Sequence, residues 1–416
     1  MSGEVPGGWE RRSLMELCSP VREAVDVKPD SAYQEIGIRS HGKGVFIKPP
    51  TTGAKLGDKR VFRVVPDVFV ANIVFAWEGA LARTTKEHEG MVASHRFPMW
   101  KPTPERLDLD YLVQFFRTDF GVDLAAQASP GGAGRNRTLN QTAFLRSLLL
   151  LPPLPEQKKI AAILSSLDEA IQATQAVLDQ TRRVKEGLLQ DLLTRGLGHT
   201  RFKQTEIGEI PESWEAVALG DVLDDMVPGK SLLTGDEPAS ESEWGVLKVS
   251  AIGQGEFREH ENKRLPDGFE VRFEHRVRGG DVLISRANTA NLVGACCRVP
   301  LREYRLMLSD KTLRLVPNAA RITPDFLAES ISQPKARSFF SQAATGSSAS
   351  MKNLSQSTIA ALPLFLPPIS EQTEIAERLD AVAKAADGDS EALARLVRLK
   401  SALLTALLTG RVRVTL

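Results

Sequence analysis

The stretch that decides the fold is LPPLPEQKKIAAILSSLDEAIQATQAVLDQTRRVKEGLLQDLLTRG, residues 151–196. A related stretch, LPPISEQTEIAERLDAVAKAADGDSEALARLVRLKSALLTALLTGR, occupies residues 366–411. Pro152 recurs as Pro367 and Glu156 as Glu371, 215 positions later in both cases (367 minus 152). A register without gaps over more than forty residues indicates an internal repeat, which constrains the fold before any other feature.

Each copy has the features of a long helix that begins near its Pro-Pro pair. Proline is tolerated in the first turn of a helix, and a glutamate there suits the helix dipole. Apolar positions then alternate in steps of three and four, which is the pattern of a coiled-coil seam. Helices of about forty residues would be about 60 Å long. The predicted seam residues are Leu164, Leu167, Ile171, Leu178, Lys185 and Leu188 in the first copy and Leu379, Val382, Asp389, Leu393, Leu396, Lys400 and Leu403 in the second.

The natural partner of each seam is the other copy, so we predict an antiparallel helix pair. The alternative is that each helix packs only on its own domain. The antiparallel register pairs Leu164 with Leu407, Lys185 with Asp389, and Lys400 with Asp168. Both lysines of the seam would then gain a carboxylate partner.

The repeat also covers the segments before the helices. A Pro-x-x-Trp-Glu motif ends at Glu10 and recurs ending at Glu215, an offset of 205 (215 minus 10). We therefore predict a mixed α/β fold in which two globular domains, related by the internal repeat, are separated by a pair of long antiparallel coiled-coil helices. The expected limits are 1–150 and 201–365 for the globular domains and 151–200 and 366–416 for the helical segments. A chain of 416 residues is long enough for this division.

The composition excludes several classes of protein. No apolar run reaches the roughly 18–20 residues of a membrane span, and the N-terminus does not have the pattern of a signal peptide. The three cysteines, Cys18, Cys296 and Cys297, have no metal-binding spacing and suit a reducing cytosol. We expect a cytoplasmic protein without a membrane partner. The net charge is only +1, so any DNA binding requires locally concentrated basic groups or help from partner chains.

The first globular domain contains a concentration of basic residues between positions 39 and 63, interrupted by one acid, Asp58. Glycines at 37, 42 and 44 allow a backbone to approach a ligand closely. Cations and histidine between glycines suit phosphates and base edges. The alternative is a solvated basic loop, and a single histidine is often only structural. The candidate DNA-binding residues of this region and of the strands after it are Arg39, His41, Lys43, Lys48, Arg83, Ser94 and His95.

Two loops of small residues, 129–138 and 345–353, precede the two helices at the same place in each repeat. Hydroxyls, amides and one or two cations can cradle a phosphate backbone. The alternative is a flexible linker. The candidates in these loops are Arg135, Asn136, Arg137, Ser347, Ser350 and Lys352.

In the second globular domain, polar residues adjoin short strand-like runs and are candidates for contacts in a DNA groove. The sequence Gly229-Lys230-Ser231 is not a phosphate-binding P-loop, because Asp224 occupies the position of the first glycine. The candidates are Lys230, Lys248, Ser250, Arg286, Asn288 and Lys311.

Catalytic motifs are missing. No complete nucleotide-binding loop, no Asn-Pro-Pro-Tyr-like or Asp-Pro-Pro-Tyr-like tetrapeptide of an amino-methyltransferase and no His-Glu-x-x-His motif occurs in the sequence. Glu156-Gln157-Lys158 and Glu261-Asn262-Lys263 fit the short Glu-x-Lys half of a nuclease site, a pattern that arises by chance. We predict neither catalytic residues nor a metal site.

The segments LPPLPEQKKIAAIL, LLQDLLTRG, LPPISEQTEIAERL and ALLTALLTG, with the two Pro-x-x-Trp-Glu openings, resemble the specificity subunit of type I restriction–modification systems. The segments 37–44 (GIRSHGKG) and 76–80 (AWEGA) also resemble motifs in one class of the target-recognition domains of these subunits. The resemblance covers essentially the whole chain, and the second domain matches more loosely.

The resemblance implies that each globular domain reads one half of a split target in double-stranded DNA. The helix pair would fix the gap between the halves and dock two modification subunits, which bind S-adenosylmethionine and methylate adenine. Restriction subunits, which are nuclease–translocases, would join the complex. The chain itself would hold no cofactor. Two other classes remain open from the residues alone: a fused methyltransferase or nuclease, and a coiled-coil adaptor that bridges proteins without reading DNA.

Overall fold

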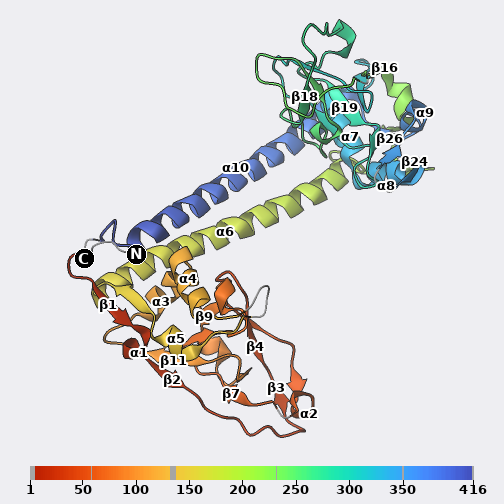
Figure 1. The fold of residues 1–416 in the computed structure, drawn as a ribbon. Coiled ribbons are helices and arrows are strands. Elements are labelled where there is room, and N and C mark those ends of the chain that lie inside the picture. The colour runs from red at the N-terminus through yellow and green to blue at the C-terminus, as the bar shows by residue number, and fades with distance from the viewer. Residues whose placement is uncertain (1–4, 58, 132–136, 231, 349–350, 415–416) are drawn as a thin grey trace. The chain divides into compact units, whose positions relative to one another are not determined.

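The computed structural model describes residues 5–57, 59–131, 137–230, 232–348 and 351–414, with backbone only for Ser347 and Ser348. It contains two compact units, coloured along the chain in Figure 1. Unit 1 is Met1–Ala176 with Ser390–Leu416, and unit 2 is Val177–Asp389. Each unit therefore contains one globular part and one end of each long helix, α6 (Leu154–Leu192) and α10 (Ile369–Leu408).

The globular part of unit 1 is built on a four-stranded antiparallel sheet in the order β2-β11-β8-β9. Phe69 and Trp100 on this sheet pack against Phe116 and Phe144 from the helices beside it. The elements are β1 (Glu10–Ser13), α1 (Leu14–Leu17), β2 (Cys18–Val21), β3 (Ala32–Tyr33), β4 (Ile36–Ile38), β5 (Val45–Ile47), β6 (Thr51–Thr52), α2 (Gly53–Leu56), β7 (Val61–Arg63), β8 (Phe69–Ala71), η1 (Ala76–Glu78), β9 (Leu81–Arg83), η2 (Lys86–His88), β10 (Val92–Ser94), β11 (Met99–Pro102), α3 (Leu109–Phe115), α4 (Asp119–Gln127), α5 (Gln141–Leu145) and β12 (Leu148–Leu151).

The globular part of unit 2 has an equivalent antiparallel sheet in the order β16-β23-β19-β21. Its apolar residues form a core with Phe326 and Phe340 from the following helices. The elements are β13 (Phe202–Thr205), β14 (Gly208–Pro211), β15 (Glu215–Ala218), η3 (Leu219–Val222), β16 (Leu223–Pro228), β17 (Gly245–Leu247), η4 (Val249–Ala251), β18 (Asn262–Arg264), η5 (Phe273–His275), β19 (Val282–Ser285), β20 (Ala287–Asn288), β21 (Cys296–Arg298), β22 (Leu306–Met307), β23 (Thr312–Pro317), α7 (Pro324–Ser332), α8 (Pro334–Ala343), β24 (Thr345–Ser348), β25 (Met351–Asn353), α9 (Gln356–Ala360) and β26 (Pro363–Leu366).

In both units, the Trp-Glu opening and the Glu-Gln helix start lie in contact. The indole N–H of Trp9 donates to the carboxylate of Glu156 at 3.0 Å, and that of Trp214 donates to Glu371 at 2.9 Å. The side chains of both tryptophans are buried, as is Glu156. A buried carboxylate without donors would be costly, so these contacts explain why each motif accompanies the other in the repeat.

The glutamine after each of these glutamates joins the helix to the globular part. The Gln157 amide donates to the carbonyls of Pro152 and Arg106, both at 2.9 Å, and its oxygen accepts from the Asp108 N–H at 2.8 Å. Gln372 makes the corresponding contacts with Pro367, Arg321 and Thr323, at 2.9, 2.8 and 2.9 Å. Both glutamines have no exposed surface. Their hydrogen bonds fix each helix start to the segment before α3 or α7.

The predicted seam is the inward side of both helices. Every predicted seam position is buried or half-buried, whereas most positions between them are exposed. In unit 1, Leu164 and Leu407 belong to the same core cluster, and Lys400 pairs with Asp168. In unit 2, Thr181 donates to Asp389 at 3.3 Å. The helices therefore run antiparallel within each unit.

One predicted pair of the seam differs from the structure. No ion pair or hydrogen bond among the described residues joins Lys185 to Asp389, whose carboxylate accepts from Thr181. Lys185 acts on Glu329 of α7, where its charge partly offsets the effect of burial on the carboxyl group. Burial still raises the pKa of Glu329. The carboxylate that faces the lysine thus comes from the globular part of unit 2 and not from the opposite helix.

Candidate nucleic-acid interface

Unit 1 carries a β-hairpin whose loop presents basic side chains. Strands β4 and β5 pair antiparallel from Ile36 with Ile47 to Ile38 with Val45. The Arg39 N–H donates to the Gly44 carbonyl at 3.0 Å and closes the loop of residues 39–44. Arg39, His41 and Lys43 are exposed on this loop, as the predicted DNA contact requires.

The loop is held against the segment that begins with η1. The N–H of His41 donates to the Glu78 carbonyl at 2.8 Å, and that of Gly42 donates to the Gly79 carbonyl at 3.0 Å. The Ser40 hydroxyl also donates to the Glu78 carboxylate at 3.0 Å. The two segments that resemble motifs of target-recognition domains, 37–44 and 76–80, are therefore in direct contact.

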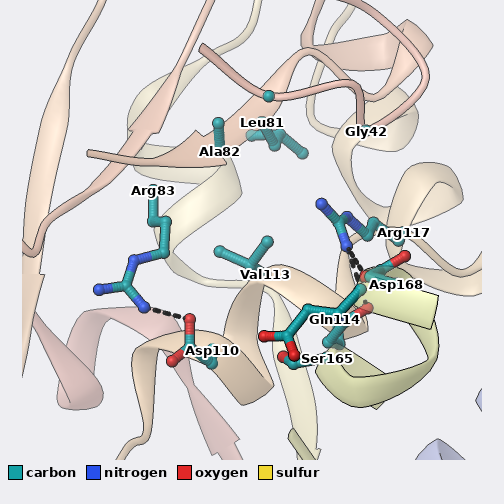
Figure 2. Close-up of a pocket in the computed structure, with 12 residues that line it drawn as sticks. Gly42, Leu81, Ala82, Arg83, Asp110, Val113, Gln114, Arg117, Ser165 and Asp168 are labelled. Carbon is teal, nitrogen blue, oxygen red and sulfur yellow. Dashed lines mark hydrogen bonds and ion pairs between the residues drawn. The ribbon is translucent and has the colours of Figure 1, made fainter. Parts of the chain in front are cut away.

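A hollow lies beside this loop, and Figure 2 shows the side chains that line it. Arg117 donates to Asp168 of α6 at 2.7 Å, and a Cβ placed on Gly42 would lie 2.9 Å from the Arg117 side chain. Burial opposes the ionisation of Asp168, but hydrogen bonds from Lys400 and Gln114 and the charge of Arg117 outweigh it and lower its pKa. The loop thus rests on an arginine that α6 and α10 hold in place.

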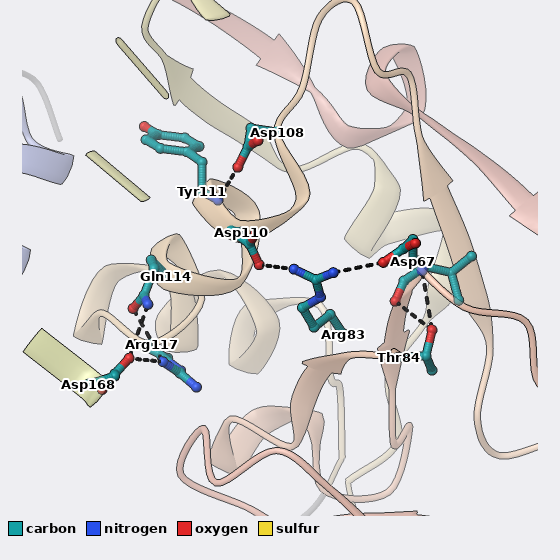
Figure 3. A network of polar contacts seen from close by, with 10 residues as sticks. Asp67, Arg83, Thr84, Asp108, Asp110, Tyr111, Gln114, Arg117 and Asp168 are labelled. Atoms are coloured by element: carbon teal, nitrogen blue, oxygen red, sulfur yellow. Dashed lines mark hydrogen bonds and ion pairs between the residues drawn. The ribbon is translucent and has the colours of Figure 1, made fainter. Parts of the chain in front are cut away.

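Arg83 lies at the other side of this hollow. Its guanidinium pairs with Asp67 at 2.7 Å and with Asp110 of α3, as Figure 3 shows. The pair with Asp110 recurs in unit 2, where Arg298 contacts Asp325 at 3.0 Å. Arg298 and Asp325 each lie 215 positions after their counterparts Arg83 and Asp110, which is the offset of the repeat. In the structure Arg83 holds α3 on the sheet through Asp110, and its contact with DNA stays a prediction.

A second hollow in unit 1 gathers three of the other predicted residues. Lys48, Ser94 and His95 line it together with Lys59 and Arg96. Lys48 is also 3.7 Å from the carboxylate of Glu35, so part of its charge is balanced. Strand pairing explains the assembly, since β10 pairs with β7 and meets Glu35 just before β4. Residues remote in the sequence thus form one basic surface.

In unit 2, most of the predicted residues line a single hollow. Its lining contains one acid, Asp310, the predicted neutral residues Ser250 and Asn288, and four lysines: Lys230, Lys248, Lys263 and Lys311. Within the described chain, Lys263 is paired with Asp236 at 2.7 Å, and the hydroxyl of Ser250 donates to Glu261 at 2.6 Å. No ion pair of the described residues involves the other three lysines. The charge of Lys248 helps to lower the pKa of both Asp236 and Glu261. Lysine side chains suit phosphate oxygens.

Lys352 and Arg286 adjoin this surface in different ways. Strand β25 pairs with β20, which places Lys352 opposite Asn288. The Lys352 ammonium donates to the Gly346 carbonyl at 2.6 Å and so stabilises its own loop. Arg286 is half-buried, and its backbone bonds to Lys311 and Leu354. The segment after α8 therefore lies next to the basic hollow because its strand β25 pairs with β20. The composition of the segment does not indicate this pairing.

Several predicted residues lie outside the described part of the chain. These are Arg135, Asn136 and Ser350, together with the side chain of Ser347. Arg137 is described, and its guanidinium lies over the Trp77 ring, 5.3 Å from the centroid. Arg137 thus contacts the segment that also supports the hairpin loop.

Sequence reasoning did not single out Lys59, Arg96 and Lys263 as DNA-binding candidates, although they line the two basic hollows. Lys59 belongs to the basic run that the sequence shows, and that run was the available signal. Lys263 follows Asn262 on β18, whose side chain is buried, and an asparagine carries no sequence signal of that burial. Arg96 had no comparable signal.

The comparisons with known proteins agree with this architecture. The family model described as type I restriction modification DNA specificity domain matches residues 6–181 and 211–393, which together exceed half of the chain. The chain therefore belongs to this family, and each of the two matches covers one copy of the repeat.

Individual relatives carry the same description. The EcoEI specificity subunit of Escherichia coli is 31% identical over 180 residues, which are 43% of this chain and 30% of that protein. The putative MjaX specificity subunit of Methanocaldococcus jannaschii is 24% identical and is matched over 99% of this chain and 95% of its own length. The crystal structure of a type I restriction–modification S subunit from M. genitalium has the same fold, with a TM-score of 0.57, 13% identity and 98% of each chain covered.

Two kinds of feature are absent from the described residues. No helix in that part of the chain has an apolar stretch long enough to cross a membrane. No group of three or more histidine, cysteine, aspartate or glutamate residues there is placed to hold a metal ion.

Proposed function

We propose that this chain is the DNA-reading subunit of a type I restriction–modification complex, in which each unit reads one half of a two-part target. The observation that carries the proposal is the duplicated architecture. Each unit has an equivalent sheet order and the same contact between a tryptophan and the Glu-Gln start of a long helix, and each has a hollow lined by basic side chains. Two surfaces on one repeated frame suit a target with two halves.

The basic surfaces are chemically suited to DNA. Exposed lysine and arginine side chains bind phosphates, while asparagine, serine and histidine among them can reach base edges. The overall charge of +1 means that these surfaces are local concentrations in an otherwise balanced chain. Such a chain would contribute selectivity, while partner chains add further phosphate contacts.

The partners and the chemistry come from the family as proposals. Two modification subunits would bind S-adenosylmethionine and methylate adenine, and restriction subunits would join them, so this chain needs no cofactor or catalytic residue. The exposed sides of α6 and α10 are available for docking these subunits. Three free, buried cysteine thiols are compatible with a cytoplasmic protein.

The test is a single-molecule methylation map of host DNA with and without the gene for this chain. The proposal predicts that one split, adenine-methylated motif disappears on deletion and returns on complementation. Footprinting with the assembled complex should protect that motif only when this chain is present. An unchanged map together with an absent footprint would contradict DNA reading and would favour the adaptor.

A further inference from the structure

The hairpin β4–β5 has three features that suit it for reading bases, and they go beyond a general basic surface. We infer that this hairpin enters the DNA major groove and that Arg39 recognises a guanine in the half-site read by unit 1. This inference rests on the proposed function. A two-stranded β-ribbon fits the major groove, and arginine binds O6 and N7 of guanine through two parallel hydrogen bonds.

The first feature is the brace behind Arg39. Its guanidinium lies over the Phe46 ring, 5.0 Å from the centroid. Phe46 in turn lies on Gly37, where an added Cβ would come within 2.3 Å of the ring. Stacking on an aromatic face limits the orientations of a guanidinium and leaves its N–H edge free. Arg39 is therefore an exposed arginine whose guanidinium lies over an aromatic ring, which suits it for two parallel hydrogen bonds to one base.

The second feature is the fixed conformation of the loop tip. His41 has a φ of +59°, in the left-handed region that residues with a side chain rarely adopt. Backbone bonds to Glu78 and Gly79 hold it there, and Gly42 lies against Arg117. Among the described residues, Asp67 is the only other non-glycine with a positive φ, and its side chain is paired with Arg83. The His41 side chain is exposed and, within the described chain, forms neither a hydrogen bond nor an ion pair. A residue held at a positive φ whose side chain forms no hydrogen bond or ion pair within the described chain points to a function for that side chain.

The third feature is the composition of the tip. Arg39, His41 and Lys43 alternate along the loop, are exposed, and form no ion pair within the described chain. A docking site for an acidic protein segment could use the same charges, but it would not need an aromatic ring beneath Arg39. Lys43, without a brace, suits a phosphate beside the base that Arg39 reads.

The experiment measures the methylation rate of the assembled complex on DNA in which each base pair of the target is replaced in turn. Arg39→Lys keeps the charge and loses the two-bond geometry. We expect it to reduce discrimination at one G·C pair of one half-site by roughly ten- to hundredfold, with the other half-site unchanged. Phe46→Leu removes the brace and should weaken discrimination at that same pair without altering Arg39.

Arg22→Lys is the matched control, because Arg22 is also exposed and lies over a phenylalanine of unit 1, 4.7 Å from the Phe62 ring. It should leave every position unchanged. Thermal unfolding of each variant verifies that the chain is folded. Unchanged discrimination in Arg39→Lys, or an equal loss in both half-sites, would overturn the inference while the wild-type chain still reads its target. If the wild-type complex shows no target, the proposed function itself fails.

Discussion

The joint between helix and globular part is alike in both units, while the surfaces beside it differ. Trp9 and Trp214 each donate to the first-turn glutamate of a long helix, and the following glutamines make the same three hydrogen bonds. The hairpin of unit 1 has a closed six-residue loop, 39–44, whereas in unit 2 the chain from Lys248 to Glu261 includes a 3₁₀ turn and borders a larger set of lysines. The repeat thus keeps the residues that join a unit to the helices and varies those of the basic surfaces.

The two joints differ in the groups that bind the glutamate in addition to the tryptophan. Glu156 is held by Arg413, at 2.7 and 2.8 Å, and Glu371 by His199 at 2.7 Å and the Leu197 N–H at 2.9 Å. In both units the partner comes from the segment after the C-terminal end of the other helix. A carboxylate buried beside an indole needs further donors, and in each unit that segment supplies them.

The largest expected effect is from removing the tryptophan of a joint. Trp214→Ala should lower the free energy of unfolding by about 3–5 kcal/mol, because Trp214 is fully buried, and Trp9→Ala should have a similar effect. Denaturant unfolding measures the loss, and limited proteolysis identifies the unit that opens. Trp244→Ala, at a half-buried tryptophan outside the joint, should cost less. A loss below about 1 kcal/mol for one member of the pair would show that the joints are not equivalent.

The joint glutamines should give the next largest effect. Gln157→Ala and Gln372→Ala each remove three hydrogen bonds and leave buried backbone groups unpaired. We expect about 1–3 kcal/mol of lost stability in each case. Gln190→Ala, at an exposed position of α6, is the control and should be near neutral. Unequal losses in Gln157→Ala and Gln372→Ala would break the comparison between the units.

One carboxyl group in each unit should make stability depend on pH, and the two groups should act in opposite directions. Asp168 in unit 1 has a lowered pKa, so its contribution is present above the pKa of the unfolded chain and is lost as pH falls through the folded value. Burial raises the pKa of Glu329 in unit 2, so its contribution is present at low pH and is lost as pH rises above the usual value of 4.5. The lysines facing these carboxyls, Lys400 and Lys185, are equivalent in the repeat.

Unfolding as a function of pH tests this contrast with the variants Asp168→Asn and Glu329→Gln. Asp168→Asn should remove part of the loss of stability toward acid. The stability of Glu329→Gln relative to the wild type should be greater at neutral pH than at pH 4, because the buried carboxyl of Glu329 then no longer has to ionise. If both variants change the pH profile in the same direction, the two carboxyls do not have the opposite shifts that the structure indicates.

The smallest effect is expected at a single lysine of the basic hollow of unit 2. Lys248→Ala should leave folding unchanged and weaken DNA binding by the assembled complex about equally for all sequences. The slope of log affinity against log salt should fall by about 1 if one phosphate contact is lost. Lys203→Ala is the control, since Lys203 lies on β13 outside the hollow and donates to the Glu212 carbonyl at 2.9 Å. An unchanged salt slope in Lys248→Ala would remove this hollow from the interface.

The sequence predicted the helices and their seam because both rest on local periodicity and on a repeat within one chain. Leu164 and Lys400 lie where the three-four spacing places them, since that spacing alone decides which side of a helix is buried. The mixed fold with two repeated globular parts and two long helices is likewise confirmed. Periodicity could not show that Glu329, from a different element, faces Lys185.

The sequence predicted the kinds of residue in the candidate site, but only part of their arrangement in space. Lys248 and Asn288 were recognised from their places beside apolar runs, and the fold brings them to one hollow. Arg83 fitted the same pattern, but two acidic residues remote in sequence engage it. The contact between the Arg39 guanidinium and the Phe46 ring depends on the register in which β4 pairs with β5. The sequence of the hairpin alone does not define that register.

The central claim is that each unit reads its own half of the target, and exchange of one globular part tests it most directly. Residues 201–365 would be replaced by the corresponding part of another member of the family, and the methylation map of the resulting strain would be recorded. The account predicts that one half of the split motif changes while the other half and the gap stay the same. A change in both halves, or in neither, would contradict it.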